Sequence, residues 1–321
     1  MTNLMKFTVT LSLIFSINHI YADREAFEST YVPLAPEKIV IQNASIYDGD
    51  GGEFFETDVL VEDGKIIAIG KDLPFSNEFK VIDAAGKWVT PGIIDIHSHM
   101  GVYPAPGVRT SSDGNEATSP VTADVWAEHS IWVQDPQYAL ALTGGVTAFH
   151  ILPGSANLIG GRGVTVKNLQ RNTINSMKFP DAPHSLKMAC GENPKRVYGN
   201  RGQAPSTRMG NAAGYRKSWI QAEGYLRRLN EYEEKSDEAK ELEYAPTRDL
   251  EMETLAGVLK GEILVHNHCY RADEMATMID IAKEFNYKIT AFHHGVEAYK
   301  IADLLADNGI CGALWADWWG F

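Results

Sequence analysis

The chain has 321 residues, of which 44% are hydrophobic and 22% are charged, and its formal net charge is -13. This composition is ordinary for a globular protein, and the length suffices for one large domain with a small appendage. The acidic balance argues against nucleic acid or an anionic membrane as a general partner. The sequence leaves a homo-oligomer open.

Residues 1–22 have the character of a secretory signal peptide. Lys6 is their only charge, residues 7–17 are apolar with Ser and Thr, and Ala22 offers a small residue before a cleavage point. An uncleaved anchor or a wrongly assigned start codon is the alternative. The apolar run is short for a membrane span, and no second run reaches spanning length. We therefore predict a periplasmic or secreted protein with no membrane contact after cleavage.

Cysteine is sparse in this chain. Cys190, Cys269 and Cys311 are widely spaced and odd in number, which does not indicate a disulfide framework. We expect all three to be buried as small apolar residues, and the sequence leaves one disulfide open.

Residues 23–90 are predicted to form an N-terminal β module. Strands are expected over residues 38–47, 57–62, 65–70 and 81–89. Asp63-Gly64 stands between the second and third of these, and this dipeptide is a strong signal of a tight hairpin turn.

The pattern changes after residue 91 to strands alternating with helices, which is typical of parallel βα units. We therefore treat residues 91–321 as one domain, with insertions at 100–116 and 195–217. The expected helices cover residues 136–143, 215–242, 272–285 and 297–308. The expected strands cover residues 93–96, 146–151, 186–190, 263–265, 288–292 and 309–314.

A His-Ser-His motif follows the first of these strands. His97 and His99 are two residues apart, so both side chains project to the same side of an extended chain and can reach one ion. Imidazole suits zinc, iron and nickel. Further histidines follow later strands at His266, His268 and the pair 293–294. The sequence therefore predicts a divalent metal, zinc before others, with one or two ions.

The segment 91–99, Pro-Gly-Ile-Ile-Asp-Ile-His-Ser-His, resembles the first-strand metal motif of the amidohydrolase superfamily. Segments 144–161, 191–196 and 317–319 resemble its imidazolonepropionase-like branch. The resemblance implies an α/β fold, a metal-dependent (β/α)8 TIM barrel with a small N-terminal β-sandwich. It also implies a hydrolase that uses metal-activated water on a carbon–nitrogen bond other than a peptide bond, for example in a cyclic amide.

The resemblance also implies a ligand set. The expected metal ligands are His97, His99, His266 and His294, with Glu192 as the bridging carboxylate. A carboxylated Lys167 is the rival bridge, and Glu192 is then free to pair with a neighbouring cation. His293 is expected to pack outward, because adjacent residues of a strand point to opposite faces.

Two further residues are assigned to the substrate. His268 is expected to bind substrate or act in catalysis, with an ordinary loop histidine as the alternative. Arg162 lies in a glycine-rich segment and is expected to hold a substrate carboxylate, unless it is an exposed arginine in a turn. The arginines of segment 195–217 have the same two interpretations. His129, His150 and His184 are expected to be ordinary surface or core histidines.

The sequence departs from the family after the seventh expected strand. Family members carry an eighth strand with a catalytic Asp, whereas here Asp317 comes too early and is expected to be a loop residue. We therefore expect a barrel that is incomplete at the C-terminus. Two alternatives to the hydrolase follow: a non-catalytic truncated remnant, or a metallopeptidase acting on short dipeptides.

Overall fold

The computed structural model describes residues 27–35 and 37–315. The predicted signal peptide and Asp317 lie outside the described residues, and their interpretations stay predictions. Within the described part, no helix is both long and apolar enough to cross a membrane.

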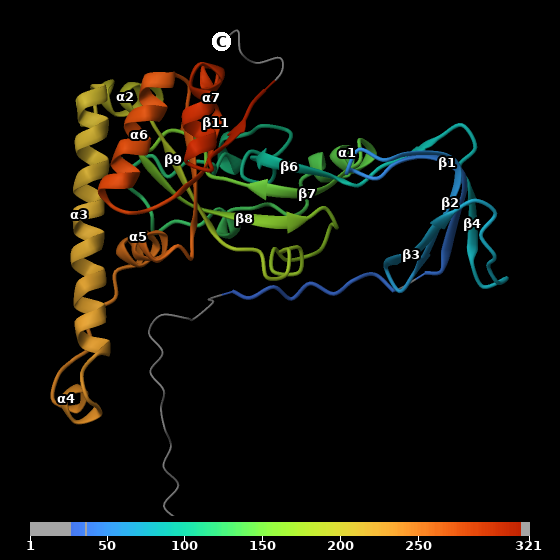
Figure 1. The fold of residues 1–321 in the computed structure, drawn as a ribbon. Coiled ribbons are helices and arrows are strands. Elements are labelled where there is room, and N and C mark those ends of the chain that lie inside the picture. Colours follow the sequence, from blue (N-terminus) through green and yellow to red (C-terminus); the bar gives the residue numbers. More distant parts are fainter. Residues whose placement is uncertain (1–26, 36, 316–321) are drawn as a thin grey trace, which may run out of the picture.

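The first of two sheets is built from residues 39–89 and stands apart from the rest of the chain (Figure 1). Its order is β3-β2-β1-β4, with β5 also paired to β1. Asp63 and Gly64 both have positive φ angles, as the predicted hairpin turn requires. These strands form one sheet, and the second layer of the expected sandwich stays a prediction. The strands are β1 (Ile39–Tyr47), β2 (Glu53–Glu62), β3 (Lys65–Gly70), β4 (Lys80–Asp83) and β5 (Trp88–Val89).

The second sheet has seven strands in the described residues and curls into a nearly closed barrel, in the order β12-β11-β10-β9-β8-β7-β6. Its strands are β6 (Ile93–Ser98), β7 (Val146–Ile151), β8 (Ile159–Lys167), β9 (Ser185–Ala189), β10 (Leu264–Cys269), β11 (Ile289–His294) and β12 (Cys311–Ala313). Six of them are the six expected strands. Because parallel strands end at the same edge, the residues that follow them gather at one mouth.

The strand β8 corrects the expectation of parallel βα units. It runs antiparallel to both β7 and β9, and a loop rather than a helix connects it to β7. The strand contains Gly160, Gly161 and Gly163, and because glycine is depleted in strands, its residue propensities do not predict a strand here. The glycines are needed for packing: at Gly161, where φ is +109°, a Cβ atom would stand 2.3 Å from the Val125 carbonyl oxygen.

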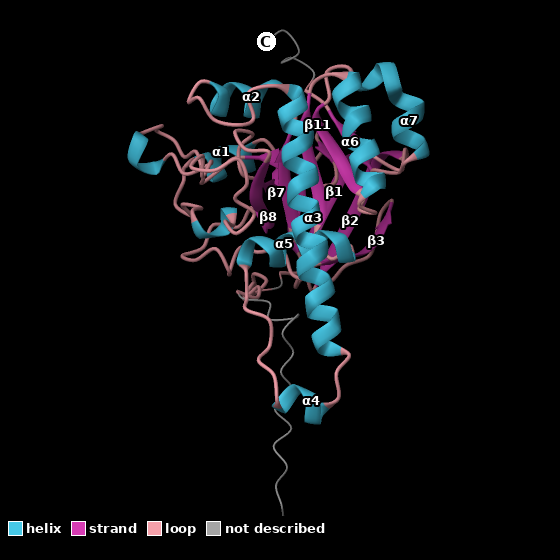
Figure 2. Cartoon of the chain, turned by 90° about the vertical axis from the view of Figure 1, so that its left-hand side faces the viewer, coloured by secondary structure: helices cyan, strands magenta, loops and turns pink. Residues whose placement is uncertain are grey.

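Helices cover the outside of the barrel. The long helix α3 begins after Thr207, whose side chain accepts the Gly210 N–H, and it lies in front of the strands in Figure 2. Its buried Trp219 joins Leu255 and Met278 in the main apolar core. The expected helix 215–242 is two helices, because Ser236 caps a second one. The helices are α1 (Gln137–Thr143), α2 (Glu192–Gly199), α3 (Arg208–Glu233), α4 (Asp237–Glu241), α5 (Leu250–Lys260), α6 (Ala272–Glu284) and α7 (Ala302–Asp307).

The cysteines differ from the expectation of three buried thiols. Cys190 and Cys269 form a disulfide between the ends of neighbouring strands β9 and β10, with a Cα–Cα distance of 5.2 Å. Cys311 is exposed and free. Spacing along the chain could not show this pair, since 79 residues separate its members.

Candidate metal centre

The His-Ser-His motif ends β6 with both imidazoles directed to one point. The Nε2 atoms of His97 and His99 are 3.2 Å apart. The Nδ1–H of His99 donates to the Leu152 carbonyl at 2.8 Å, which leaves its Nε2 lone pair unprotonated. Two ligands of a tetrahedral zinc ion at about 2.0–2.1 Å stand about 3.4 Å from each other. The spacing of these two nitrogens therefore fits one shared ion.

His293 occupies the centre of the group, and the expectation that it packs outward is wrong. The side chain is fully buried, its Nδ1 is 2.8 Å from Nδ1 of His97, and its Nε2 is 2.8 Å from Nδ1 of His266. Register explains this, because His268 of β10 pairs with His293 of β11. Paired residues of parallel strands share a face, and so do residues two apart.

His294 also reaches the group, although it pairs in register with Cys269. Its φ angle is 67°, and this left-handed turn swings the side chain back toward the mouth. Its ring lies 4.3 Å from that of His268 and 5.2 Å from that of His97, and it stacks on Trp315 at 4.1 Å. The structure therefore brings both histidines of the pair together with His97.

His268 is buried beside these rings. Its Nε2 is 3.2 Å from the Asn193 side-chain nitrogen, and its Nδ1 is buried without a hydrogen-bond partner in the described chain. A buried polar atom without a partner is costly and indicates a ligand or substrate contact.

Lys187 is a further member that sequence reasoning missed. It lies in β9, pairs in register with His266, and is fully buried. Its Nζ donates to the Pro153 carbonyl at 2.9 Å. Burial lowers the pKa of Lys187 to about 7, so a large share of its amine is neutral at physiological pH. The sequence does contain a signal for this residue, because Lys187 stands between apolar residues in the predicted strand 186–190.

His150 is the second missed member. It lies one residue before the end of β7, with its ring 4.6 Å from that of His266. Both of its ring nitrogens are engaged, Nδ1 with Thr165 Oγ1 at 3.0 Å and Nε2 with Ser185 Oγ at 2.9 Å. With both nitrogens engaged in these contacts, it is suited to support the ring of His266.

Burial keeps these imidazoles neutral, which is the form that binds metal. It lowers the pKa of His99 and His294 to about 4, of His266 to about 3 and of His293 to about 2, and the positive charge of Lys187 acts in the same direction. The pKa values of His97 and His268 are lowered further, again chiefly by burial.

Three candidate residues lie elsewhere. Glu192 is exposed at the first position of α2. The Lys167 ammonium lies over the rings of Tyr31 and Phe179, at 4.9 and 4.3 Å. These two positions do not join the histidine group.

Arg162 is also directed away from the histidines. Its guanidinium stacks on Trp126 at 4.2 Å and its Nε donates to Thr254 Oγ1 at 2.8 Å. It pairs in register with Leu186, the neighbour of Lys187, and strand alternation therefore places it on the opposite face from that lysine.

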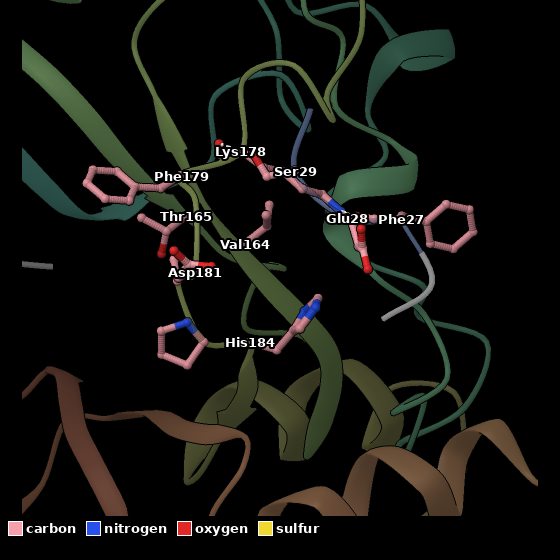
Figure 3. A pocket seen from close by; sticks show the side chains of 11 residues that line it. Phe27, Glu28, Ser29, Val164, Thr165, Lys178, Phe179, Asp181 and His184 are labelled. Atoms are coloured by element: carbon pink, nitrogen blue, oxygen red, sulfur yellow. Dashed lines mark hydrogen bonds between the residues drawn. The ribbon is translucent and has the colours of Figure 1, made fainter. Parts of the chain in front are cut away.

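A small hollow of about 50 Å³ lies on another part of β8. Figure 3 shows the strand residues Val164 and Thr165 among the side chains that line it, together with Phe179, Ser29 and His184. The described lining contains no member of the histidine group, and its one histidine is His184, whose ring lies beside Trp126. The hollow is thus separate from the histidine group.

The residues that are present fit a metal, although their positions are not those of a loaded site. In the described chain, no three side chains of His, Cys, Asp or Glu converge on one point as ligands. Two Nε2 atoms at ligand spacing and a group of neutral rings nevertheless form a nitrogen donor set of the kind zinc prefers.

Known proteins support a superfamily assignment. No family model matches the chain. An amidohydrolase from Thermotoga maritima MSB8 is 38% identical, with a TM-score of 0.79 over 87% of this chain and 70% of that one. Amidohydrolase tasK of Hapsidospora irregularis is 36% identical over 275 residues, which is 80% of this chain and 28% of that protein. Dihydroorotase of Lactobacillus helveticus is 46% identical over 74 residues.

Fold and site together define a barrel protein with a histidine-rich mouth, and the chain belongs to the amidohydrolase superfamily. It spans 28% of the length of tasK and 16% of that of the dihydroorotase.

Proposed function

We propose that the chain is a metal-dependent hydrolase of a small molecule, acting on a carbon–nitrogen bond of a cyclic amide or a related compound. The observation that carries the proposal is the meeting of His97, His99, His266 and His293 from three strands at one mouth of the barrel. A divalent ion held there, zinc before others, would lower the pKa of a water molecule and would polarise the scissile carbonyl.

The side chains of this site have separate tasks. His97 and His99 would hold the ion through Nε2, and the Leu152 carbonyl fixes the ring of His99. The main-chain N–H of His97 donates to Asp95 Oδ1 at 3.0 Å and fixes the turn that presents the motif. His268 faces the substrate with Nδ1, where it can pass a proton to or from the reacting group.

Lys187 replaces Glu192 and Lys167 as the proposed source of a bridging carboxylate. Its neutral amine can add to carbon dioxide, forming an N–C bond and releasing one proton, and the product is a carbamate with two oxygen donors. Its burial beside His266 in register and its lowered pKa support this assignment.

We also propose that the protein acts outside the cytoplasm, in the periplasm or as a secreted protein. The Cys190–Cys269 disulfide supports this location, because disulfides persist in oxidising compartments. N-terminal sequencing of the mature protein tests it, and an intact Met1 would contradict it.

The test of the function uses the full chain, loaded with zinc and bicarbonate. Hydantoin, dihydropyrimidine, N-acyl amino acid and dipeptide substrates are compared by release of the amine or carboxylate product. We expect turnover of an amide, and His293→Asn should lower kcat/KM at least 100-fold. His129→Asn is the matched control, since His129 is stacked on Trp126 away from the site. Turnover confined to dipeptides would identify a metallopeptidase, and no turnover would favour the non-catalytic remnant.

A further inference from the structure

The helix α2 carries polar side chains beside the histidine group that the proposed chemistry does not use. It begins directly after Gly191 at the end of β9. Its Asn193 contacts Nε2 of His268 at 3.2 Å, and the Arg196 guanidinium lies 3.5 Å from the other polar atom of Asn193, Oδ1. Arg196 is therefore connected to the substrate-facing His268 through one amide.

Arg196 differs from the other arginines of its segment in how its donors are used. Arg201 donates to the Ala117 carbonyl, Arg208 pairs with Glu274, and Arg216 pairs with Glu284. Arg196 is exposed, and within the described residues its guanidinium makes only the long contact with Asn193, so most of its donors face solvent. A guanidinium with free donors can bind a carboxylate in a bidentate manner.

Tyr270 lies beside the histidines and within the electrostatic reach of this arginine. Its ring lies 4.5 Å from that of His268 and 5.7 Å from that of His294. Burial raises the pKa of its hydroxyl, the charge of Glu192 raises it as well, and Arg196 lowers it, so both charged groups lie near that hydroxyl.

We infer that Arg196, with Asn193 and Tyr270, forms a subsite for the carboxylate of the substrate. This inference rests on the proposed function and narrows its substrate class to amides that carry a free carboxylate, such as N-acyl amino acids. Loss of Arg196 should disfavour an anionic ligand. The Glu192 carboxylate then has no opposing charge beside it and repels the carboxylate of the ligand.

The test measures binding to the full chain in the absence of metal, with hippurate and its neutral amide hippuramide as probes in titration calorimetry. Wild type should bind hippurate about 10- to 100-fold more tightly than hippuramide, as a charge-assisted pair implies. Arg196→Met should abolish or reverse that preference, and Arg196→Lys should restore part of it. Lys195→Met is the control, because it removes the same charge from the next helix position and should retain the preference.

Equal binding of the two probes to wild type, no binding of either, or an unchanged preference in Arg196→Met would overturn the subsite. The same preparations separate this inference from the function on which it rests. Hydrolysis of neutral and anionic amides at equal kcat/KM would overturn the subsite alone. A retained carboxylate preference in a chain that takes up no metal and turns over no amide would overturn the proposed function alone.

Discussion

Lys187 should make the chain less stable at neutral pH than it would be with an apolar residue of the same length. Burial lowers the pKa of Lys187 from 10.5 to about 7, so at pH 7 folding releases about half of the proton that the unfolded chain holds. This pKa shift lowers the free energy of unfolding by about 4 kcal/mol at pH 7 and by about 1 kcal/mol at pH 10. The sign follows from the lowered value: stability rises with pH between about 7 and 10.5.

Lys187→Met removes this cost together with one hydrogen bond to Pro153, which is worth about 1 kcal/mol. The variant should therefore be more stable than wild type by about 3 kcal/mol at pH 7, and the difference should vanish near pH 10. Urea unfolding of metal-free protein in carbonate-free buffer at the two pH values measures it. The variant should also lose activity, because it removes the proposed bridging group; gains in stability at site residues commonly reduce function.

A second buried lysine provides the matched contrast. Lys178 forms a buried ion pair with Glu128 at 2.8 Å. Lys178→Met leaves that buried carboxylate without its close cationic partner, and only His129 remains near it at 3.8 Å, so the variant should destabilise the chain by about 3 kcal/mol. If Lys187→Met destabilised the protein at both pH values, as Lys178→Met is expected to do, the account of a buried neutral amine would be refuted.

Three other outcomes are expected. Replacing Cys190 and Cys269 together by Ala should lower the free energy of unfolding by about 2–4 kcal/mol, because a crosslink across 79 residues restricts the unfolded chain; Cys311→Ser should change it little. The free energy of unfolding should fall as pH drops from 6.5 toward 4, because in this range His99 and His150 gain protons only in the unfolded chain. His150→Gln should reduce that loss by about 3 kcal/mol. An unchanged pH profile in this variant would contradict a buried, neutral His150. Zinc should raise Tm, and a chelator should reverse the rise.

The sequence supports much of the fold because hydrophobic patterning and turn chemistry are local. Asp63-Gly64 predicts its hairpin, and the apolar runs 93–96 and 146–151 predict β6 and β7. The strand β8 is not predicted from the sequence. Its Gly161 is required because the Val125 backbone packs closely against it, and Val125 is distant in sequence. The Cys190–Cys269 pair is likewise a consequence of strand order.

The candidate site shows the same division. His97 and His99 follow from spacing along one strand, whereas the role of His293 depends on the register between β10 and β11. Burial of Lys187 depends on the strands on both sides of it. Glu192 was assigned by position after a strand, but it opens α2, where its side chain is exposed.

X-ray diffraction at the zinc absorption edge tests the central assertion most directly. Crystals of zinc-loaded protein should show an anomalous peak about 2.0–2.1 Å from Nε2 of both His97 and His99, with an atom of His266, His293 or Lys187 completing the coordination. A peak bound only by other residues, or no peak in fully loaded protein, would contradict a metal centre at this mouth of the barrel.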